Sequence, residues 1–316
     1  MLVSLIVPCY NEQEVLPVFR KETSAVVEKL KEQYGCSFEY ILVDDGSKDG
    51  TLSYMKSWHE EDPSVHYISF SRNFGKEAAL YAGLSSAKGD YIAVMDADLQ
   101  DPPEMLGEML EVLTNEDYDI AAARRTSREG EPPIRSFFAD RFYELMNHSS
   151  RAKMENGARD FRLMKRCVVD AVLSMGEYNR FSKGIFSWVG FKTKWLDYTH
   201  VDRAKGTTKW SFWSLFSYAI DGIVGFSTSP LLFAAYLGLF MFIISIIGIL
   251  FIIVRRLLFY EPVKGWASLA CIILFCSGVQ LLCIGIIGEY LAKTYLEVKH
   301  RPIYLVRESD IEKEED

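Results

Sequence analysis

The 316-residue chain lacks several features by which common classes of protein are recognised. Its six cysteines include no Cys-x-x-Cys pair, so the sequence indicates neither a zinc site nor a disulfide framework. Its five histidines lack the spacing of metal ligands, and we expect them to be ordinary surface residues. The Gly75-Lys76 pair lacks the glycine spacing of a phosphate-binding P-loop, which argues against an ATPase.

An excess of positive charge is also lacking. The formal net charge is −8, which argues against nucleic acid as a partner, because phosphate backbones are normally met by a surplus of Lys and Arg. Residues 1–9 contain neither a basic leader nor a small-residue cleavage site. We therefore expect no secretory signal, and a first domain that stays in the cytosol.

Charge is absent altogether from two long apolar stretches in the last third of the chain. No charged residue lies between Gly222 and Val254, or between Gly265 and Gly288. Each stretch exceeds the roughly 20 residues that cross a bilayer. We predict two transmembrane helices, at residues 229–255 and 265–290. The alternative is a helix pair buried in a soluble core, which is unusual for two uncharged runs of this length.

These spans divide the chain into an α/β domain and a membrane hairpin. The domain covers residues 1–205, an amphipathic juxtamembrane segment covers 206–228, and a C-terminal tail covers 291–316. Basic residues on both outer flanks predict a multi-pass protein of the cytoplasmic membrane with the domain and both termini in the cytosol, although the connector between the spans also carries cations. The acidic end, 308–316, is expected to be disordered.

The first 125 residues alternate short β-rich runs with amphipathic helical segments. This pattern predicts a largely parallel sheet covered by helices on both faces. In such sheets ligands bind beyond the carboxyl ends of the strands. A charged, proline-containing segment at 127–158 is a candidate flap over that site. The predicted strands are 3–7, 40–43, 65–69, 91–95 and 120–123, and the predicted helices are 14–33, 51–61, 76–87, 103–114 and 166–175, with mixed signals at 160–164.

Acidic residues follow two of the predicted strands. Asp96-Ala97-Asp98 places two carboxylates one residue apart, where both can turn toward one hard cation and leave room for phosphate oxygens. The plain alternative is a solvated turn. Asp44 and Asp45 begin a second polar turn, in which one carboxylate can be structural and the other can accept a hydrogen bond from a nucleobase or a ribose.

Cations and one further carboxylate complete the candidate set. Arg124 and Arg125 follow a strand at the same rim, and a cationic run from Arg203 to Lys209 precedes the membrane. These cations can face a diphosphate or a lipid phosphate, although the run at 203–209 is also typical of a patch that binds anionic lipid. Asp160 is a candidate catalytic carboxylate, but an aspartate next to an arginine is more often an ion-pair or turn residue.

Taken together, five motifs resemble those of the family 2 glycosyltransferases, over essentially the whole chain. The resemblance is greatest to the membrane-anchored polyprenyl-phosphate glycosyltransferases, and two C-terminal spans favour the bacterial glucosyl subgroup. The motifs are Val7-Pro8-Cys9-Tyr10-Asn11-Glu12, Val43-Asp44-Asp45-Gly46-Ser47-Lys48-Asp49-Gly50-Thr51, Asn73-Phe74-Gly75-Lys76, Met95-Asp96-Ala97-Asp98-Leu99-Gln100-Asp101-Pro102-Pro103 and Gly206-Thr207-Thr208-Lys209-Trp210.

The resemblance implies a GT-A type domain and a role for each matching residue. Asp96 and Asp98 would hold Mg²⁺ or Mn²⁺ on the diphosphate of a nucleotide sugar, and Asp160 matches a carboxylate often proposed as the catalytic base. Nucleotide-sugar contacts are implied for Pro8, Tyr10, Glu12, Asp44, Asp45 (the base), Ala97 and Arg125, and phosphate contacts for Arg203 and Lys209.

Physical chemistry qualifies one of these roles. A phosphate monoester has a second pKa near 6, so an acceptor lipid phosphate is mostly a dianion at neutral pH and needs little help from a base. Asp160 can instead orient a sugar hydroxyl or Arg159. Residues 178–181 also lack the Gln-x-x-Arg-Trp motif of processive synthases, which favours transfer of one sugar.

The expected reaction is therefore an inverting transfer of one hexose, glucose from UDP-glucose, to polyprenyl phosphate. Two alternatives stay open at this point. One is transfer to a lipid hydroxyl such as that of diacylglycerol, for which Asp160 would be needed as a base. The other is a nonenzymatic membrane scaffold. Glycines within the spans also allow close helix packing, so a homo-oligomer is possible.

Overall fold

The computed structural model of the protein describes residues 1–125, 141, 144, 147, 154–198, 220–259 and 265–311. Arg203 and Lys209 lie outside these residues, as do most of the candidate flap at 127–158 and most of the juxtamembrane segment.

Within the described residues, the head of the molecule is built on one mixed sheet with the strand order β7-β5-β6-β4-β1-β2-β3-β8. β4, β1, β2 and β3 are parallel neighbours, as predicted. β6 runs antiparallel to both β4 and β5, and β8 runs antiparallel to β3. In chain order the strands are β1 (Leu2–Cys9), β2 (Ser37–Asp44), β3 (Val65–Phe70), β4 (Tyr91–Val94), β5 (Ile120–Arg125), β6 (Ala158–Lys165), β7 (Thr193–Tyr198) and β8 (Val306–Ser309).

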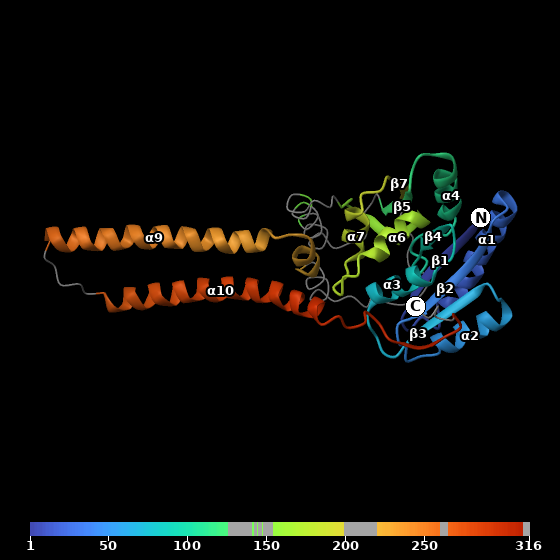
Figure 1. Ribbon diagram of the computed structural model, residues 1–316, viewed down its shortest axis with the longest axis horizontal. Coiled ribbons are helices and arrows are strands. Elements are labelled where there is room, and N and C mark those ends of the chain that lie inside the picture. The colour runs from blue at the N-terminus through green and yellow to red at the C-terminus, as the bar shows by residue number, and fades with distance from the viewer. Residues whose placement is uncertain are drawn as a thin grey trace.

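Helices cover both faces of this sheet (Figure 1). Successive side chains of a strand point to opposite faces, so Leu5 and Val7 of β1 join one apolar cluster while Ile6 joins the other. The first cluster includes residues of α1, α2 and α4, and the second includes residues of α3, α6 and α7. These helices are α1 (Leu16–Tyr34), α2 (Thr51–Glu61), α3 (Lys76–Ser86), α4 (Met105–Asn115), α6 (Arg166–Ser174) and α7 (Ser182–Trp188).

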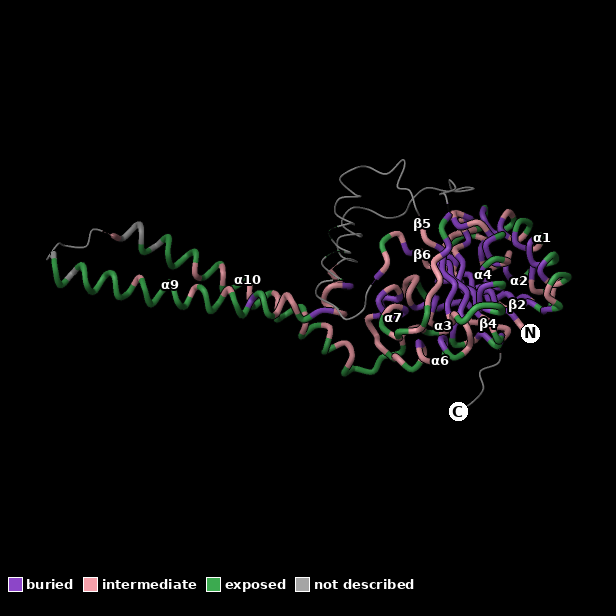
Figure 2. The backbone as a smooth tube through the Cα atoms, turned by 90° about the horizontal axis from the view of Figure 1, so that it is seen from above, coloured by how far each residue is buried: buried purple, intermediate pink, exposed green. Residues whose placement is uncertain are grey.

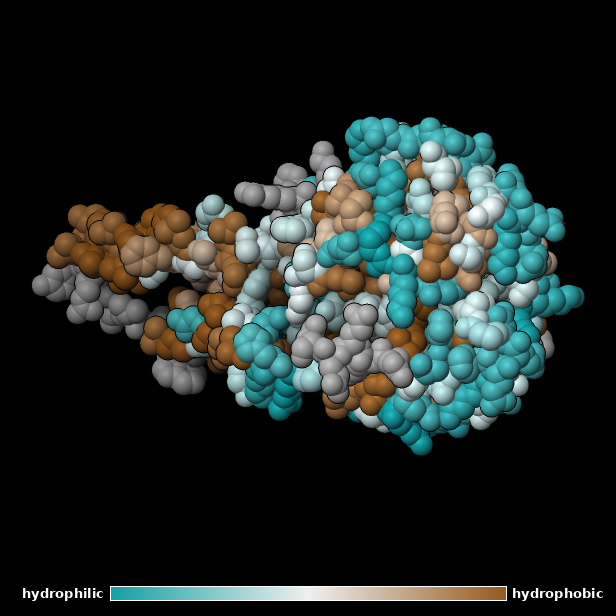
Figure 3. Space-filling view, turned by 45° about the vertical axis from the view of Figure 1, so that its right-hand side comes forward, coloured by the Kyte–Doolittle hydropathy of each residue, from teal (hydrophilic) through white to brown (hydrophobic). Residues whose placement is uncertain are grey.

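Two long helices, α9 (Ser229–Phe259) and α10 (Trp266–Val298), project side by side away from the head (Figures 1 and 2). Two segments of 27 and 28 residues within them are apolar enough to cross a membrane, and neither is buried in the protein. Figure 3 shows the hydrophobic surface of these helices beside a largely hydrophilic head. The 31 residues of α9 span about 46 Å, more than the roughly 30 Å of a bilayer core. Within the described residues, the two helices are therefore not a pair buried in the core of this chain.

α10 continues beyond the predicted end of the second span at residue 290. Its last turns attach to the head, because the Glu297 carboxylate accepts hydrogen bonds from the backbone N–H groups of Tyr178 and Asn179. Lys293 pairs with Asp221, just before α9. The end of the membrane hairpin is thus joined to the segment that leads into α7.

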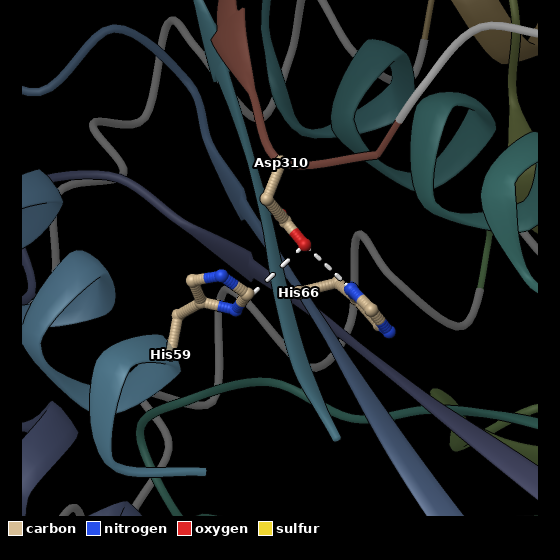
Figure 4. A group of neighbouring side chains, drawn as sticks. All are labelled: His59, His66 and Asp310. Carbon is tan, nitrogen blue, oxygen red and sulfur yellow. Dashed lines mark hydrogen bonds and ion pairs between the residues drawn. The ribbon is translucent and has the colours of Figure 1, made fainter. Parts of the chain in front are cut away.

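The C-terminal segment corrects one prediction. Residues 308–311 are not a disordered tail, because β8 pairs with the edge strand β3, whose ladder groups would otherwise lack partners. Asp310 accepts hydrogen bonds from the Tyr67 backbone N–H and the His66 ring, and His59 lies 3.7 Å from the same carboxylate (Figure 4). The two histidines are half-buried and hold this segment in place.

We predict that the docking of β8 weakens above neutral pH. Hydrogen bonding to Asp310 raises the pKa of His66 above 6.5. The free energy by which the charged His66–Asp310 pair stabilises the docking of β8 is therefore fully present below pH 6.5, and it is lost as the pH rises through the raised pKa of His66. The effect is at most about 1 kcal/mol, because the pair is partly exposed. Hydrogen exchange of residues 306–311, corrected for its intrinsic pH dependence, should accelerate between pH 6 and 8.

The His66→Gln variant should lose this pH dependence, and His300→Gln, at the exposed end of α10, should keep it. If His66→Gln retained the full dependence, His66 would not be the titrating group.

Candidate active site

The loops that follow β1 and β2 are joined to each other at the carboxyl edge of the sheet. The Asn11 N–H donates to Ser47 Oγ and the Glu12 N–H donates to Thr51 Oγ1, each at 2.8 Å. In return, the Lys48 N–H donates to Asn11 Oδ1 at 2.9 Å. Pro8 is the second-to-last residue of β1, directly before this junction. The two motifs that the sequence assigns to nucleotide binding therefore form one structural unit.

Asp44 and Asp45 have different environments. Asp44 is buried and accepts hydrogen bonds from the Ser47 N–H and the Ser69 hydroxyl, so it holds the turn. Asp45 accepts the backbone N–H groups of Phe74 and Gly75. Burial raises the pKa of Asp45 to about 6, although these N–H groups favour its ionised form. Asp45 thus fixes the loop before α3, and contact with a nucleobase would use its remaining acceptor capacity.

Lys76, the first residue of α3, lies at the centre of the site. Its Nζ is 2.7 Å from Asp96 Oδ1 and 2.5 Å from Asp160 Oδ2. Gly75, at φ 97°, provides the backbone conformation that starts the helix at this position. One ammonium group therefore bridges the first carboxylate of the Asp-x-Asp motif and the candidate catalytic carboxylate, which are 64 residues apart in the sequence.

No role for Lys76 was predicted from the sequence, although the residue ends the Asn73-Phe74-Gly75-Lys76 motif of the family resemblance and was excluded as part of a P-loop. The signal was its position: it follows β3 on the rim that carries Asp45 and Asp96, and parallel strands bring such residues together.

Asp160, on β6, is surrounded by positive charge. Burial alone would raise its pKa, but the charges of Lys76 and Lys183 outweigh burial and hold the pKa of Asp160 well below its usual range. A carboxylate stabilised so strongly in its ionised form has little tendency to take up a proton. The arrangement suits charge balance and orientation better than general-base catalysis.

The acidic loop itself is held in shape from β6 and β7. Asp101, which is 2% exposed, accepts hydrogen bonds from Arg159 Nε and from the Tyr198 hydroxyl. Asp98 Oδ1 accepts the Gln100 N–H at 3.2 Å, and Leu99 adopts a φ of 55°. Arg159 is therefore paired with Asp101, and the structure does not bring it to Asp160 as a partner.

The two adjacent arginines at the end of β5 differ. Arg124 is engaged by Asp197 and Glu155, so its charge is balanced within the domain. Arg125 is half-buried, and its backbone N–H donates to the Gly157 carbonyl at 3.0 Å. Arg125 is the arginine for which the resemblance implies a contact with the nucleotide sugar.

The acidic loop fits a hard divalent cation. Asp96 and Asp98 are half-buried at the rim and offer carboxylate oxygens, which Mg²⁺ and Mn²⁺ prefer. The Asp96 carboxylate already attracts one cation, the Lys76 ammonium. Among the described residues, the group of three potential metal ligands whose ligand atoms lie within 4.8 Å of one another is His59, His66 and Asp310, at the far β3–β8 edge, where Figure 4 shows the carboxylate directed at both rings. The expectation that these two histidines are ordinary surface residues was therefore wrong.

The fold, a mixed α/β sheet of mostly parallel strands, is of the GT-A type found in glycosyltransferases. Residues 4–173 match Glycosyl transferase family 2, and the chain belongs to that family.

Relatives extend the similarity across the membrane helices. The SfII prophage-derived bactoprenol glucosyl transferase of Shigella flexneri is 41% identical over 98% of both chains. The putative glycosyltransferase CsbB of Bacillus subtilis (strain 168) is 41% identical over 98% of this chain and 92% of its own. A solved mannosyltransferase, PcManGT from Pyrobaculum calidifontis, is 18% identical with a TM-score of 0.48, covering 70% of this chain and 61% of its own. That likeness is too distant to bear on function.

We predict that Lys76→Met destabilises the protein and increases its response to a divalent cation. Removing the ammonium leaves Asp96 and Asp160 without their shared counter-charge and lowers the free energy of unfolding by about 1–2 kcal/mol, less than for a fully buried pair because the Lys76 side chain is 36% exposed. Added Mn²⁺ should then raise the melting temperature more in the variant than in the wild type.

Lys165→Met is the matched control, because Lys165 pairs with Asp119 away from the rim. An equal Mn²⁺ response in wild type and Lys76→Met would show that Lys76 and the metal do not share Asp96.

Proposed function

We propose that this enzyme transfers one glucose residue from UDP-glucose to a polyprenyl phosphate in the cytoplasmic membrane. The observation that carries the proposal is the cluster of Lys76, Asp96 and Asp160 on a head that is attached to two exposed apolar helices. The full-length similarity to a protein named bactoprenol glucosyl transferase supports the same acceptor and sugar.

In the proposed reaction the acceptor phosphate is the nucleophile. One of its oxygens forms a bond to the anomeric carbon, while the bond from that carbon to the nucleotide diphosphate breaks and the electron pair leaves with UDP. Direct displacement inverts the anomeric centre. Because the acceptor is mostly a dianion above pH 6, no protein base has to remove a proton first.

Residues of the rim would bind the donor. We assign nucleotide contacts to Pro8, Tyr10, Glu12, Asp45, Ala97 and Arg125, with Asp44 holding the turn beside them. Arg203 and Lys209 remain proposed ligands of the lipid phosphate. Asp96 and Asp98 would hold Mg²⁺ or Mn²⁺, which when bound offsets the charge of the departing diphosphate.

Lys76 and Asp160 would act on the acceptor side. Asp160 keeps Lys76 beside the acidic loop, where the ammonium can lower the repulsion between two phosphate groups that approach each other. The ion pair of Asp160 with Lys76 favours a phosphate acceptor over a lipid hydroxyl, because a hydroxyl acceptor would require a base with a free carboxylate. Residues 178–181, without a Gln-x-x-Arg-Trp sequence, support the transfer of a single sugar.

A radiolabel assay tests the proposed reaction. Full-length protein with undecaprenyl phosphate and Mg²⁺ should move label from UDP-glucose, and not from GDP-mannose or UDP-galactose, into a mild-acid-labile lipid. Asp98→Asn should reduce the rate by at least about 100-fold. The control is Asp117→Asn, which changes an exposed carboxylate far from the rim.

Membrane vesicles extend the assay to the proposed orientation. UDP-glucose does not cross membranes, so only inside-out vesicles should incorporate label if the head is cytosolic. Transfer of label to diacylglycerol, or to no lipid, would refute the proposed acceptor.

The pH profile distinguishes the acceptor from Asp160 as the titrating group. We predict that the acid limb of kcat/KM follows the second ionisation of the acceptor phosphate, near pH 6. Replacing the acceptor by a phosphonate, whose second pKa is higher, should move the limb upward. Asp160→Asn should lower kcat and keep the limb. Loss of the limb in Asp160→Asn would instead identify Asp160 as a base.

A further inference from the structure

Three side chains of the kinds that bind metal ions meet at the edge of the sheet where the C-terminal segment docks (Figure 4). His59 comes from α2, His66 from β3, and Asp310 directly follows β8. One ligand atom of each residue lies within 4.8 Å of those of the other two. His66 is the second residue of β3, so the group lies at the opposite end of that strand from the rim that carries the acidic loop.

The two histidines meet because a tight turn joins α2 to β3. Asp62 accepts hydrogen bonds from the N–H and the hydroxyl of Ser64, which closes the turn. His59, in the last turn of α2, is thereby brought beside His66, with the two ring centroids 6.3 Å apart. Asp310 lies 244 residues after His66 and joins the rings only when β8 pairs with β3. The pair of imidazoles is therefore local, and the carboxylate arrives with the C-terminal segment.

Backbone groups orient two of the three side chains. The Val65 carbonyl lies 2.5 Å from His59 Nδ1. Because a carbonyl only accepts, it keeps the proton on Nδ1 and leaves the Nε2 lone pair of the neutral ring for a metal ion. The Tyr67 N–H donates to Asp310 Oδ1, while Oδ2 faces the rings. Metal-binding histidines and carboxylates are typically oriented by hydrogen bonds of this kind.

The spacing of the group is close to that of a metal site. His66 Nδ1 shares a proton with Asp310 Oδ2 at 2.5 Å, and His59 Nδ1 lies 3.7 Å from the same oxygen. A zinc ion holds its ligand atoms about 3.3–3.6 Å apart, so it would take the place of the shared proton after side-chain shifts of about 1 Å. The His59 and His66 side chains are 33% and 31% exposed, which leaves room for these shifts and for a water molecule as a fourth ligand.

The charges around the group balance one another. Lys56 pairs with Glu308 at 2.8 Å, and Glu39 and Lys88, of opposite sign, lie near His66. Together with Asp310 and Arg307, these residues carry three negative and three positive charges. A cation would therefore bind here through direct bonds to its ligands and not through long-range attraction.

The types of ligand select the metal. Two imidazole nitrogens and one carboxylate oxygen are a common ligand set for Zn²⁺. Mg²⁺ prefers ligands that are all oxygen, such as the carboxylates of the acidic loop. The two ends of the sheet thus differ in the cation that they suit.

We propose that His59, His66 and Asp310 bind one Zn²⁺ ion, which fastens the C-terminal segment to the edge of the sheet. Only the docked segment brings the three ligands together, so the free energy of metal binding would add to the docking of β8. The inference goes beyond the proposed function, because no step of sugar transfer uses this edge.

Calorimetric titration of the full-length protein with ZnCl₂ tests this proposal. The protein carries no polyhistidine tag and is kept in an uncharged detergent near pH 8, with excess Mg²⁺ to occupy the oxygen ligands of the rim. We expect saturable binding of one Zn²⁺ ion per chain.

Four substitutions locate the binding. His66→Gln and Asp310→Asn each remove one ligand and should weaken Zn²⁺ binding at least about tenfold. His300→Gln removes an exposed imidazole beyond α10, and Cys167→Ser removes an exposed thiol on α6; both should leave binding unchanged. Melting temperatures check that the variants fold.

Hydrogen exchange measures the fastening of the segment in the unmodified protein. At pH 8, Zn²⁺ at ten times its dissociation constant should slow the exchange of residues 306–311 about tenfold, and Mg²⁺ should not. Zn²⁺ should have no such effect in His66→Gln. The absence of saturable Zn²⁺ binding, binding that both ligand variants retain, or unchanged exchange of 306–311 with Zn²⁺ bound would overturn the proposal, whether or not sugar transfer is observed.

Discussion

The parallel pairing of β1 with both β2 and β4 is the constraint on which the rest of the structure depends. Because the three strands run in the same direction and are buried on both faces, the loops that follow them emerge at one edge. That edge therefore carries three polar segments: the Asn11–Glu12 turn after β1, the acidic turn after β2 and the Asp-x-Asp loop after β4. Their polar side chains meet there because the interior of the sheet offers them no hydrogen-bond partners.

Lys76 turns this edge into a site with balanced charge. Asp96 and Asp160 come from strands on either side of a parallel-to-antiparallel switch, since β6 runs against β4. Their carboxylates would repel each other without the ammonium between them. The same lysine lowers the pKa of Asp160. In this respect the site differs from enzyme sites in which an isolated, desolvated carboxylate serves as a base. A phosphate acceptor, which carries its own charge, suits this arrangement.

The membrane helices are attached to the catalytic head at its C-terminal edge as well as at the start of α9. Glu297 caps the segment before α7, and the chain then crosses α3 and joins the sheet as β8. The hairpin of α9 and α10 and the edge of the sheet are thus connected through about ten consecutive residues after α10.

The sequence alone determined the elements that depend on local pattern. Alternating apolar runs and helical periodicity located α2 without error and the first five strands to within a few residues, and uncharged length located the two long apolar helices α9 and α10. The pattern also placed Asp45 and Asp96 at one rim, and the resemblance to family 2 glycosyltransferases added Asp160. Only the tertiary structure decided how distant segments pair: that β6 and β8 are antiparallel, that 308–311 are ordered, and that Lys76 lies between two aspartates. Such contacts arise from the register and direction of strands far apart in the chain, and a four-residue edge strand or a single lysine carries no local signal of its partner.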